Sequence, residues 1–219
     1  LLFGVGYPQV AYMWRQLTFE LPAPERREAP HILEVSVPDW LSDLGLPADL
    51  KARIAKAGID KLVFKAPTRG LSLHLGFDYV GEHKMGPLSI AMFKVKEAGG
   101  LAIQAALSMA RSRDLTGTIK NTAVVTVGPS LHGKSTLTIM IELAGSELAG
   151  RLKLKADPEE GVYPMNDDIV MLQRLHPAGA LQSGNGHAGP HYSIDGTEDN
   201  FYTVPFGLSR EHDPITYDV

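Results

Sequence analysis

The stretch NTAVVTVGPSLHGKS, residues 121–135, decides the fold class of this 219-residue chain. Residues 121–127 are rich in β-branched side chains, and this composition predicts a short buried strand that ends at Val127. Residues 128–135 fit the pattern G-x-x-x-x-G-K-[ST] at every fixed position, and residues 135–148 predict a helix directly after it. A strand, a glycine-containing loop and a helix in this order are typical of a phosphate-binding loop in an α/β protein.

The residue types of this loop suit a polyphosphate. Glycines let backbone N–H groups turn inward, and the start of a helix adds unpaired N–H groups and the positive end of its dipole. The ammonium of Lys134 would contact the β- and γ-phosphates, and the hydroxyl of Ser135 would bind Mg²⁺. A chance match is the competing interpretation, and Pro129, which lacks an N–H, is a small point in its favour. We expect the nucleotide to contact Gly128, Ser130, Leu131, His132, Gly133, Lys134, Ser135 and Thr136.

A phosphate loop needs a carboxylate that holds the metal from the other side. Asp167 and Asp168, directly before the apolar residues 169–172, are the best candidates. Adjacent carboxylates in a strand point to opposite faces, so one of them can face the metal. A solvated turn before a strand is the alternative. The predicted metal ligands are therefore Ser135, Asp167 and Asp168.

Composition excludes several classes of protein. Hydrophobic residues make up 44% and charged residues 21%, which is ordinary for a globular chain and excludes a disordered one. The net charge is -4 and the pI is about 6.1, so the basic footprint of a nucleic-acid partner is absent. The chain has no cysteine, which fits a reducing compartment, and no apolar run approaches the roughly 18 residues that span a membrane. We expect a cytoplasmic protein, and because the chain begins with Leu1 we interpret it as a piece of a longer one.

The rest of the chain predicts further elements around this loop. A composition shift near residue 116 suggests two parts, an N-terminal α/β region over residues 1–115 and a nucleotide-binding domain over residues 116–219. No feature predicts an oligomeric state. The three histidines of the glycine-rich stretch 176–191, which we expect to be a mobile loop, lack regular ligand spacing and are interpreted as solvated. The predicted strands are residues 31–37, 61–65, 71–75 and 169–172, and the predicted helix is residues 47–57.

The phosphate loop resembles that of ATP-dependent phosphoenolpyruvate carboxykinase, which reads G-x-S-G-T-G-K-T-T-L-S. Upstream, YVGEHKMG at residues 79–86 resembles the Y-x-G-E-M-K-K-G segment of that family, and Asp167-Asp168 resembles its G-D-D segment. The resemblance covers roughly residues 70–172. The loop positions that match are Gly128, Ser130, Gly133, Lys134, Thr136 and Leu137.

This resemblance implies a mononucleotide-binding α/β domain, with a mixed sheet and the phosphate loop, packed on the N-terminal region. It implies the reaction of oxaloacetate and ATP to phosphoenolpyruvate, ADP and CO₂, with a small anionic substrate, Mg²⁺ on the nucleotide and a second ion, usually Mn²⁺. Lys84, Lys134 and Asp168 are the catalytic residues that it implies. It also implies a strand over residues 100–110, where propensity alone predicts a helix, and we follow the resemblance.

Two departures from the family concern the second metal. Met85 stands where the family has a lysine ligand, and Ala110 stands where it has a histidine ligand. A thioether and a methyl group do not replace an amine and an imidazole on such an ion. His83, beside the gap, is either a compensating ligand or an ordinary exposed histidine. The function therefore stays open between the family reaction, a kinase of the same fold with a different small-molecule or protein acceptor, and a non-catalytic ATP-binding module.

Overall fold

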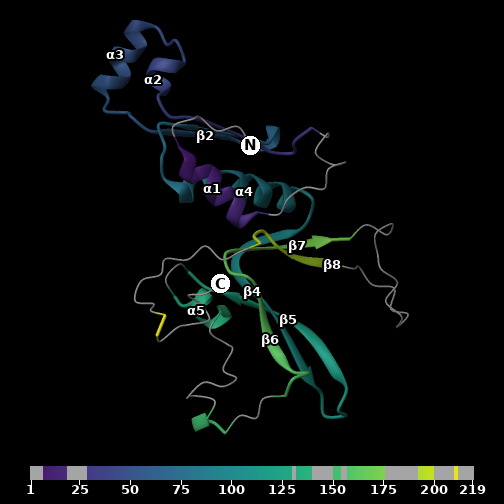
Figure 1. Cartoon of the computed structure of the whole chain (residues 1–219). Coiled ribbons are helices and arrows are strands. Elements are labelled where there is room, and N and C mark those ends of the chain that lie inside the picture. Colours follow the sequence, from purple (N-terminus) through teal and green to yellow (C-terminus); the bar gives the residue numbers. More distant parts are fainter. Residues whose placement is uncertain are drawn as a thin grey trace. The chain divides into compact units, whose positions relative to one another are not determined.

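The computed structural model describes residues 7–18, 29–129, 132–139, 150–153, 157–175, 192–199 and 210–211. Within these residues the protein is a mixed α/β structure with two sheets and a few helices (Figure 1). The chain divides into two compact units: unit 1 is Leu1–Leu101 with Gln173–Pro190, and unit 2 is Ala102–Leu172 with His191–Val219. The functional division near residue 116 stays a prediction. No helix in the described ranges has the length and apolar character needed to cross a membrane.

Unit 1 contains a three-stranded sheet in the order β1-β3-β2. Its strands are β1 (Leu33–Val37), β2 (Leu62–Ala66) and β3 (Leu71–Leu75), which confirms the three strands predicted in this region. β1 runs parallel to β3, and β2 runs antiparallel to it. A short 3-10 helix, η2 (Pro67–Arg69), and Gly70 with a φ of 65° form the turn between β2 and β3.

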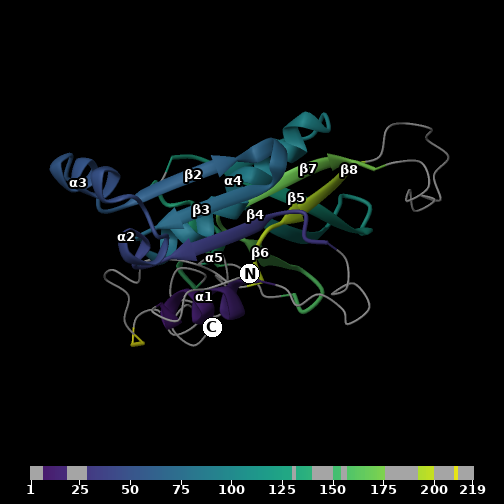
Figure 2. The ribbon, with the colours of Figure 1, turned by 90° about the horizontal axis from the view of Figure 1, so that it is seen from above.

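Helices cover this sheet and extend from it (Figure 2). α4 (Val80–Glu97) contacts all three strands, and α1 (Pro8–Leu17) packs on α4. The short α2 (Trp40–Asp43) and the predicted α3 (Ala48–Lys56) connect β1 to β2. Neither α1 nor α4 was predicted. For α4 the reason is its composition, because two glycines and Pro87 normally argue against a helix.

The face of the sheet that is buried is polar. Along β1, Glu34 and Ser36 are buried while the apolar residues between them are only half-buried. In the parallel register Glu34 lies beside Ser72, and Ser36 lies beside His74; both β3 residues are fully buried. Two-residue periodicity correctly indicates the strands, but the side chains on the covered face are the polar ones.

Unit 2 is built around one long strand, β4 (Leu101–Arg113). The middle residues of β4 form part of the hydrophobic core of this unit. Ala105 and Ala106 are fully buried, and Ala105 packs in a cluster with Leu107 and Val170. The structure confirms a strand here rather than a helix, because pairing on both edges overrides propensity. The sheet has the order β5-β4-β7-β8, and β6 also pairs with β4. Its other strands are β5 (Ile119–Val127), β6 (Gly161–Asn166), β7 (Ile169–Arg174) and β8 (Tyr192–Gly196). The helix α5 (Lys134–Ile139) follows β5 along the chain.

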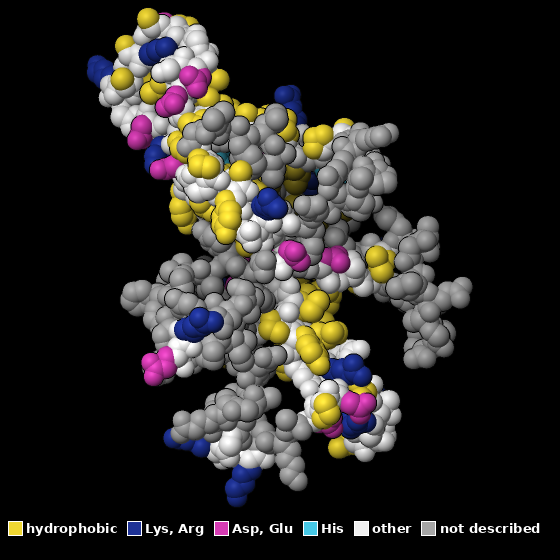
Figure 3. Space-filling view, viewed as in Figure 1, with side chains coloured by type: hydrophobic (Ala, Val, Ile, Leu, Met, Phe, Trp, Pro, Cys, Tyr) yellow, Lys and Arg dark blue, Asp and Glu magenta, His cyan; other side chains and the backbone are white. Residues whose placement is uncertain are grey.

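The expected burial of the strand before the motif is wrong. β5 is a strand, as predicted, but within the described residues it pairs only with β4 and most of its residues are exposed. Val124 is 41% exposed and Val127 is 65% exposed. Figure 3 shows hydrophobic side chains at the surface in this part of unit 2. β-Branched composition indicates a pleated strand but not which of its faces is covered. α5 begins as predicted, and residues 140–149 of the expected helix lie outside the described residues.

The turn between β4 and β5 is organised by Asp114. Its Oδ1 accepts hydrogen bonds from the backbone N–H groups of Thr116 (2.8 Å) and Thr118 (3.1 Å), and its Oδ2 pairs with Lys120 Nζ at 2.8 Å. The hydrogen bond from Lys120, followed by those from Thr116, lowers the pKa of Asp114 from its ordinary value of 3.8.

We expect Asp114→Ala to destabilise the hairpin at neutral pH. Because the pKa is lower in the folded state, the stabilisation by Asp114 is present above pH 3.8 and is lost as the pH falls through the folded-state pKa. Denaturant unfolding of both proteins should therefore show a difference in the free energy of unfolding that shrinks with acidification. A difference that grows with acidification would contradict this reading.

Candidate functional site

The predicted phosphate loop connects β5 to α5. Val127 ends the strand, Lys134 begins the helix, and the first helical backbone hydrogen bond runs from Leu137 N to Gly133 O at 2.9 Å. Gly133 has a φ of 82°, a conformation that favours glycine, so the fixed glycine of the motif has a backbone reason. Ser130, Leu131 and the side chain of Thr136 lie outside the described residues. The structure thus supplies the expected strand before the loop and the expected start of a helix after it.

Lys134 is folded back over its own loop. Its side chain is largely buried, and Nζ donates a hydrogen bond to the carbonyl oxygen of Pro129 at 3.0 Å. The aliphatic stem lies over Gly128, since a Cβ built at Gly128 would be 3.6 Å from Lys134 Cγ. A phosphate oxygen is a stronger acceptor for an ammonium than a neutral carbonyl. A phosphate bound at this loop would therefore compete with the Pro129 carbonyl for the ammonium of Lys134.

The acidic pair lies in a bend between β6 and β7, not in a strand as expected. Asp167 is 3% exposed, whereas Asp168 is half-buried and its Oδ1 accepts a hydrogen bond from Gln104 Nε2 at 3.2 Å. The two carboxylates thus differ in environment, as predicted, although a bend and not a strand produces the difference.

The register of β4 brings the loop and the acidic pair to the same level of the sheet. Ala105 is the cross-strand partner of Val127, the residue before the motif, and its backbone N–H donates to Asp168 O at 2.8 Å. The start of the loop and the acidic bend therefore flank one residue of β4 on its two edges. With neighbouring strands about 4.8 Å apart, the two backbones are separated by about 10 Å.

Asn166 holds the acidic bend and was not identified from the sequence as a site residue. It is 1% exposed, and its Nδ2 donates to Ile169 O at 2.9 Å across the bend. Its Oδ1 accepts from the backbone N–H groups of Thr197 (3.1 Å) and Glu198 (3.2 Å). One amide thus joins β6, β7 and the segment after β8. Asparagine next to two aspartates was the available signal, because asparagine bonds readily to nearby backbone.

Replacing Asn166 by alanine should destabilise unit 2 by roughly 2–4 kcal/mol, because buried backbone groups lose their partners. We expect the denaturation midpoint to fall, and we expect Asn121→Ala, at an exposed position on β5, to leave it nearly unchanged. Equal midpoints for the two variants would show that the amide does not hold the bend.

The segment that resembles the substrate-side motif begins α4 in unit 1. Lys84 is 3% exposed, and Glu82 pairs with Lys65 at 3.1 Å. Met85 is half-buried. Lys84 and Lys134 belong to different units, so the joint catalytic role of the two lysines stays a prediction.

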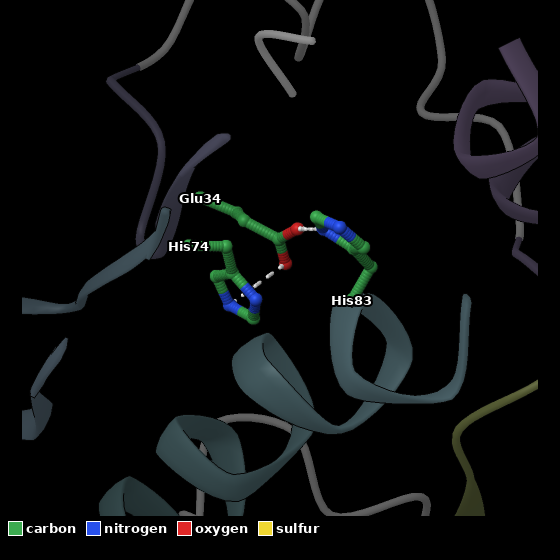
Figure 4. A group of neighbouring side chains, drawn as sticks. All are labelled: Glu34, His74 and His83. Carbon is green, nitrogen blue, oxygen red and sulfur yellow. Dashed lines mark hydrogen bonds and ion pairs between the residues drawn. The ribbon is translucent and has the colours of Figure 1, made fainter. Parts of the chain in front are cut away.

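Of the two interpretations of His83, the ordinary exposed histidine is wrong: the side chain is fully buried, with Glu34 and His74 (Figure 4). Its Nδ1 lies 2.6 Å from Glu34 Oε1, and its Nε2 lies 3.1 Å from the carbonyl oxygen of Phe77. On the other side of the carboxylate, His74 Nε2 lies 3.9 Å from Glu34 Oε2 and 2.7 Å from Ser72 Oγ. The two oxygens of Glu34 therefore face one imidazole each, in the polar layer under α4.

Burial and pairing act differently on the three groups. Burial raises the pKa of Glu34, and burial lowers the pKa of His74 to about 4. Burial alone would lower the pKa of His83, but its hydrogen bonds to Glu34 and to Phe77 outweigh burial and raise it. Burial thus favours a neutral His74, and the 2.6 Å contact between His83 Nδ1 and Glu34 Oε1 requires one hydrogen between these two atoms.

Comparison with known proteins gives one partial similarity. No family model matches the chain. A stretch of 121 residues, 49% of the chain, is 31% identical to phosphoenolpyruvate carboxykinase (ATP) from Aeropyrum pernix. The chain spans 24% of the length of that relative. The match supports a carboxykinase-like relationship at most.

Proposed function

We propose that the protein is an ATP- and Mg²⁺-dependent phosphotransferase of the phosphoenolpyruvate carboxykinase type. The loop at residues 128–135 would bind the phosphates of ATP, with Lys134 on the β- and γ-phosphates. Lys84 would act on the side of the small anionic substrate. The family reaction, oxaloacetate and ATP to phosphoenolpyruvate, ADP and CO₂, is the version that we propose first.

The single observation that carries this proposal is the placement of Ala105. It pairs with Val127 on one edge of β4 and bonds to the Asp167-Asp168 bend on the other. Lys134 and Asp167, which are 33 residues apart along the chain, thus belong to segments that flank one strand. Positioning and charge neutralisation are the main contributions of a protein to phosphoryl transfer, and in the proposed site the loop and the acidic pair would supply both.

The donor set fits Mg²⁺, which prefers carboxylate and hydroxyl oxygens. Asp167, Asp168 and Ser135 would hold the ion with the phosphates. When bound, Mg²⁺ would neutralise charge on the phosphate oxygens. Lys134 would bind and orient the phosphate tail, and the bend held by Asn166 would keep the carboxylates in place.

Met85 and Ala110 favour a second version of the function. Because they replace two ligands that the family uses for Mn²⁺, the same fold could transfer phosphate to a different small molecule or to a protein without that ion. A non-catalytic ATP-binding module is the remaining alternative. All three versions share the nucleotide site in unit 2.

A coupled assay separates the three versions. Purified protein would be incubated with Mg²⁺ and ATP, with and without oxaloacetate and Mn²⁺, while ADP and phosphoenolpyruvate are measured. Oxaloacetate-dependent formation of both products supports the first version, and ADP formation only with another acceptor supports the second. Binding of ATP without turnover leaves the module, and absence of ATP binding rejects all three.

A further inference from the structure

We propose that Glu34, His74 and His83 form a structural binding site for one divalent transition-metal ion, and that Zn²⁺ is the ion that these donors fit best. The site belongs entirely to unit 1 and is separate from the loop and the acidic pair of unit 2. Its three ligand atoms come from β1, β3 and α4, and all lie within 4.8 Å of one another. An ion there would fasten the helix to the sheet.

The first support is the polar layer in which the cluster lies. A helix that packs on a sheet normally buries apolar side chains, whereas α4 covers Glu34, Ser36, Ser72 and His74. The approach is close, because a Cβ built at Gly86 of α4 would lie 2.5 Å from His74 Nε2 and 2.9 Å from Ser72 Oγ. The helix is thus brought down onto polar groups, which is costly unless those groups find partners.

The second support is that several of these buried polar atoms have no hydrogen-bond partner. Among the described residues, Glu34 Oε2, His74 Nδ1 and Ser36 Oγ are buried and unsatisfied. An unsatisfied carboxylate oxygen in a dry interior is unfavourable. Glu34 Oε2 faces His74 (Figure 4), so an ion between them would satisfy it. An ion would thus remove an unfavourable feature of the metal-free arrangement.

The third support is the orientation of His83. A carbonyl oxygen can only accept, so His83 Nε2 carries a hydrogen and donates it to Phe77 O. Nδ1 is then the nitrogen that can ligate, and it points at Glu34. Metal-binding histidines usually donate their other N–H to a carbonyl or carboxylate in this way. The bond to Phe77 therefore prepares His83 as a ligand.

The distances require only small movements. Two ligand atoms on a tetrahedral zinc ion are about 3.3 Å apart. Glu34 Oε1 lies 2.6 Å from His83 Nδ1, and Glu34 Oε2 lies 3.9 Å from His74 Nε2. These two distances lie on either side of this value. A shift of the carboxylate by roughly half an ångström toward His74 makes both suitable. The imidazoles are stacked at 4.7 Å, so one ring must also turn about its Cβ–Cγ bond, where the torsional preference is broad.

The charges allow a cation. Lys65 is already paired with Glu82, and Lys84, the residue after His83, projects from α4 about 100° further around the helix. Because the 2.6 Å contact between His83 Nδ1 and Glu34 Oε1 requires one hydrogen between them, Zn²⁺ bound by both atoms would release that proton to solvent. Two imidazoles and one carboxylate suit zinc better than magnesium, which requires oxygen ligands.

Titration of the chelator-treated full chain with Zn²⁺ tests the proposal. We expect one ion per chain, release of about one proton, and a rise in Tm of about 5–10 °C at a hundredfold excess over Kd. Mg²⁺ at the same concentration should leave Tm unchanged. No saturable Zn²⁺ binding, or binding without a change in Tm, would overturn the proposal.

Variants assign the binding to this cluster. His83→Gln and Glu34→Gln should each lower the affinity for Zn²⁺ at least tenfold, whereas His31→Gln, at an exposed position, should not. A chain in which His176, His187 and His191 are all changed to Gln should still bind. Loss of binding in that chain, with binding retained by His83→Gln, would place the ion elsewhere and refute the site.

A spectroscopic measurement covers the case in which the cluster variants do not fold. Co²⁺ added to the unmodified chain should give visible absorption bands of a low-symmetry four- or five-coordinate site, and Zn²⁺ should remove them by competition. A spectrum that stays that of hexa-aqua Co²⁺ would overturn the proposal. Binding of ATP to unit 2 is an independent result, so either proposal can fail without the other.

Discussion

Replacing Lys134 by alanine is expected to lower the affinity for Mg²⁺-ATP by roughly 10- to 100-fold, the size of one or two lost charge-assisted hydrogen bonds. The ammonium of Lys134 donates a hydrogen bond to the carbonyl oxygen of Pro129 in its own loop. An anion is a better acceptor for an ammonium than this neutral carbonyl. Calorimetric titration of both proteins with Mg²⁺-ATP measures the loss. Because the side chain of Lys134 is largely buried, Lys134→Met is the variant that best preserves packing.

The matched control is Lys120→Ala on the same strand that leads to the loop. Lys120 is exposed and pairs with Asp114 at the far end of β5, so its removal should leave the affinity within about twofold. If Lys120→Ala weakens ATP binding as much as Lys134→Ala does, the effect is general electrostatics, and the loop is not the binding site.

The largest expected effect on stability comes from Gly70→Ala. Gly70 has a φ of 65°, and a Cβ there would lie only 2.3 Å from the backbone oxygen of His31, so the chain that enters β1 would have to move. Gly70 O also accepts a hydrogen bond from Leu33 N at 2.7 Å, which ties the turn to β1. We expect unit 1 to lose about 3–5 kcal/mol from the combined strain and overpacking, measured by denaturant unfolding.

Gly58→Ala separates the two causes. Gly58 has nearly the same φ, 66°, but nothing lies within 4 Å of the position of its Cβ. Its replacement should therefore cost only the left-handed backbone, about 1–2 kcal/mol. Equal losses at the two glycines would mean that the turn moves away from His31 without cost and that the close approach is unimportant.

The strands were predictable from the sequence, and the reason is local. Residues 31–37 and 71–75 alternate, residues 61–65 contain a short apolar run, and each segment forms a strand. The helix α4 was not predictable, because Gly86 and Pro87 argue against a helix and only the close approach to His74 explains the glycine. Similarly, the burial of β5 was misjudged because the composition of a strand does not say whether a partner covers it.

The loop motif of the candidate site was predictable from the sequence, but the contacts that hold the acidic bend were not. The fixed glycine and lysine of the loop can be recognised from the sequence, because their spacing is that of a phosphate-binding motif. The bond between Asn166 and the segment after β8 depends on pairing over a long separation, which no local pattern encodes. The cluster of Glu34, His74 and His83 has no regular ligand spacing, and in an alternating strand such as β1 a glutamate is normally interpreted as solvent-facing.

The most direct test of the central claim is the distance from Lys134 Nζ to the nearest phosphate oxygen in a crystal structure of the protein with Mg²⁺ and ATP. We predict about 2.7–2.9 Å, with the contact to the Pro129 carbonyl broken and the β-phosphate enclosed by residues 128–135. A structure in which the nucleotide is bound elsewhere, or in which Lys134 stays on Pro129 beside an empty loop, would contradict the account.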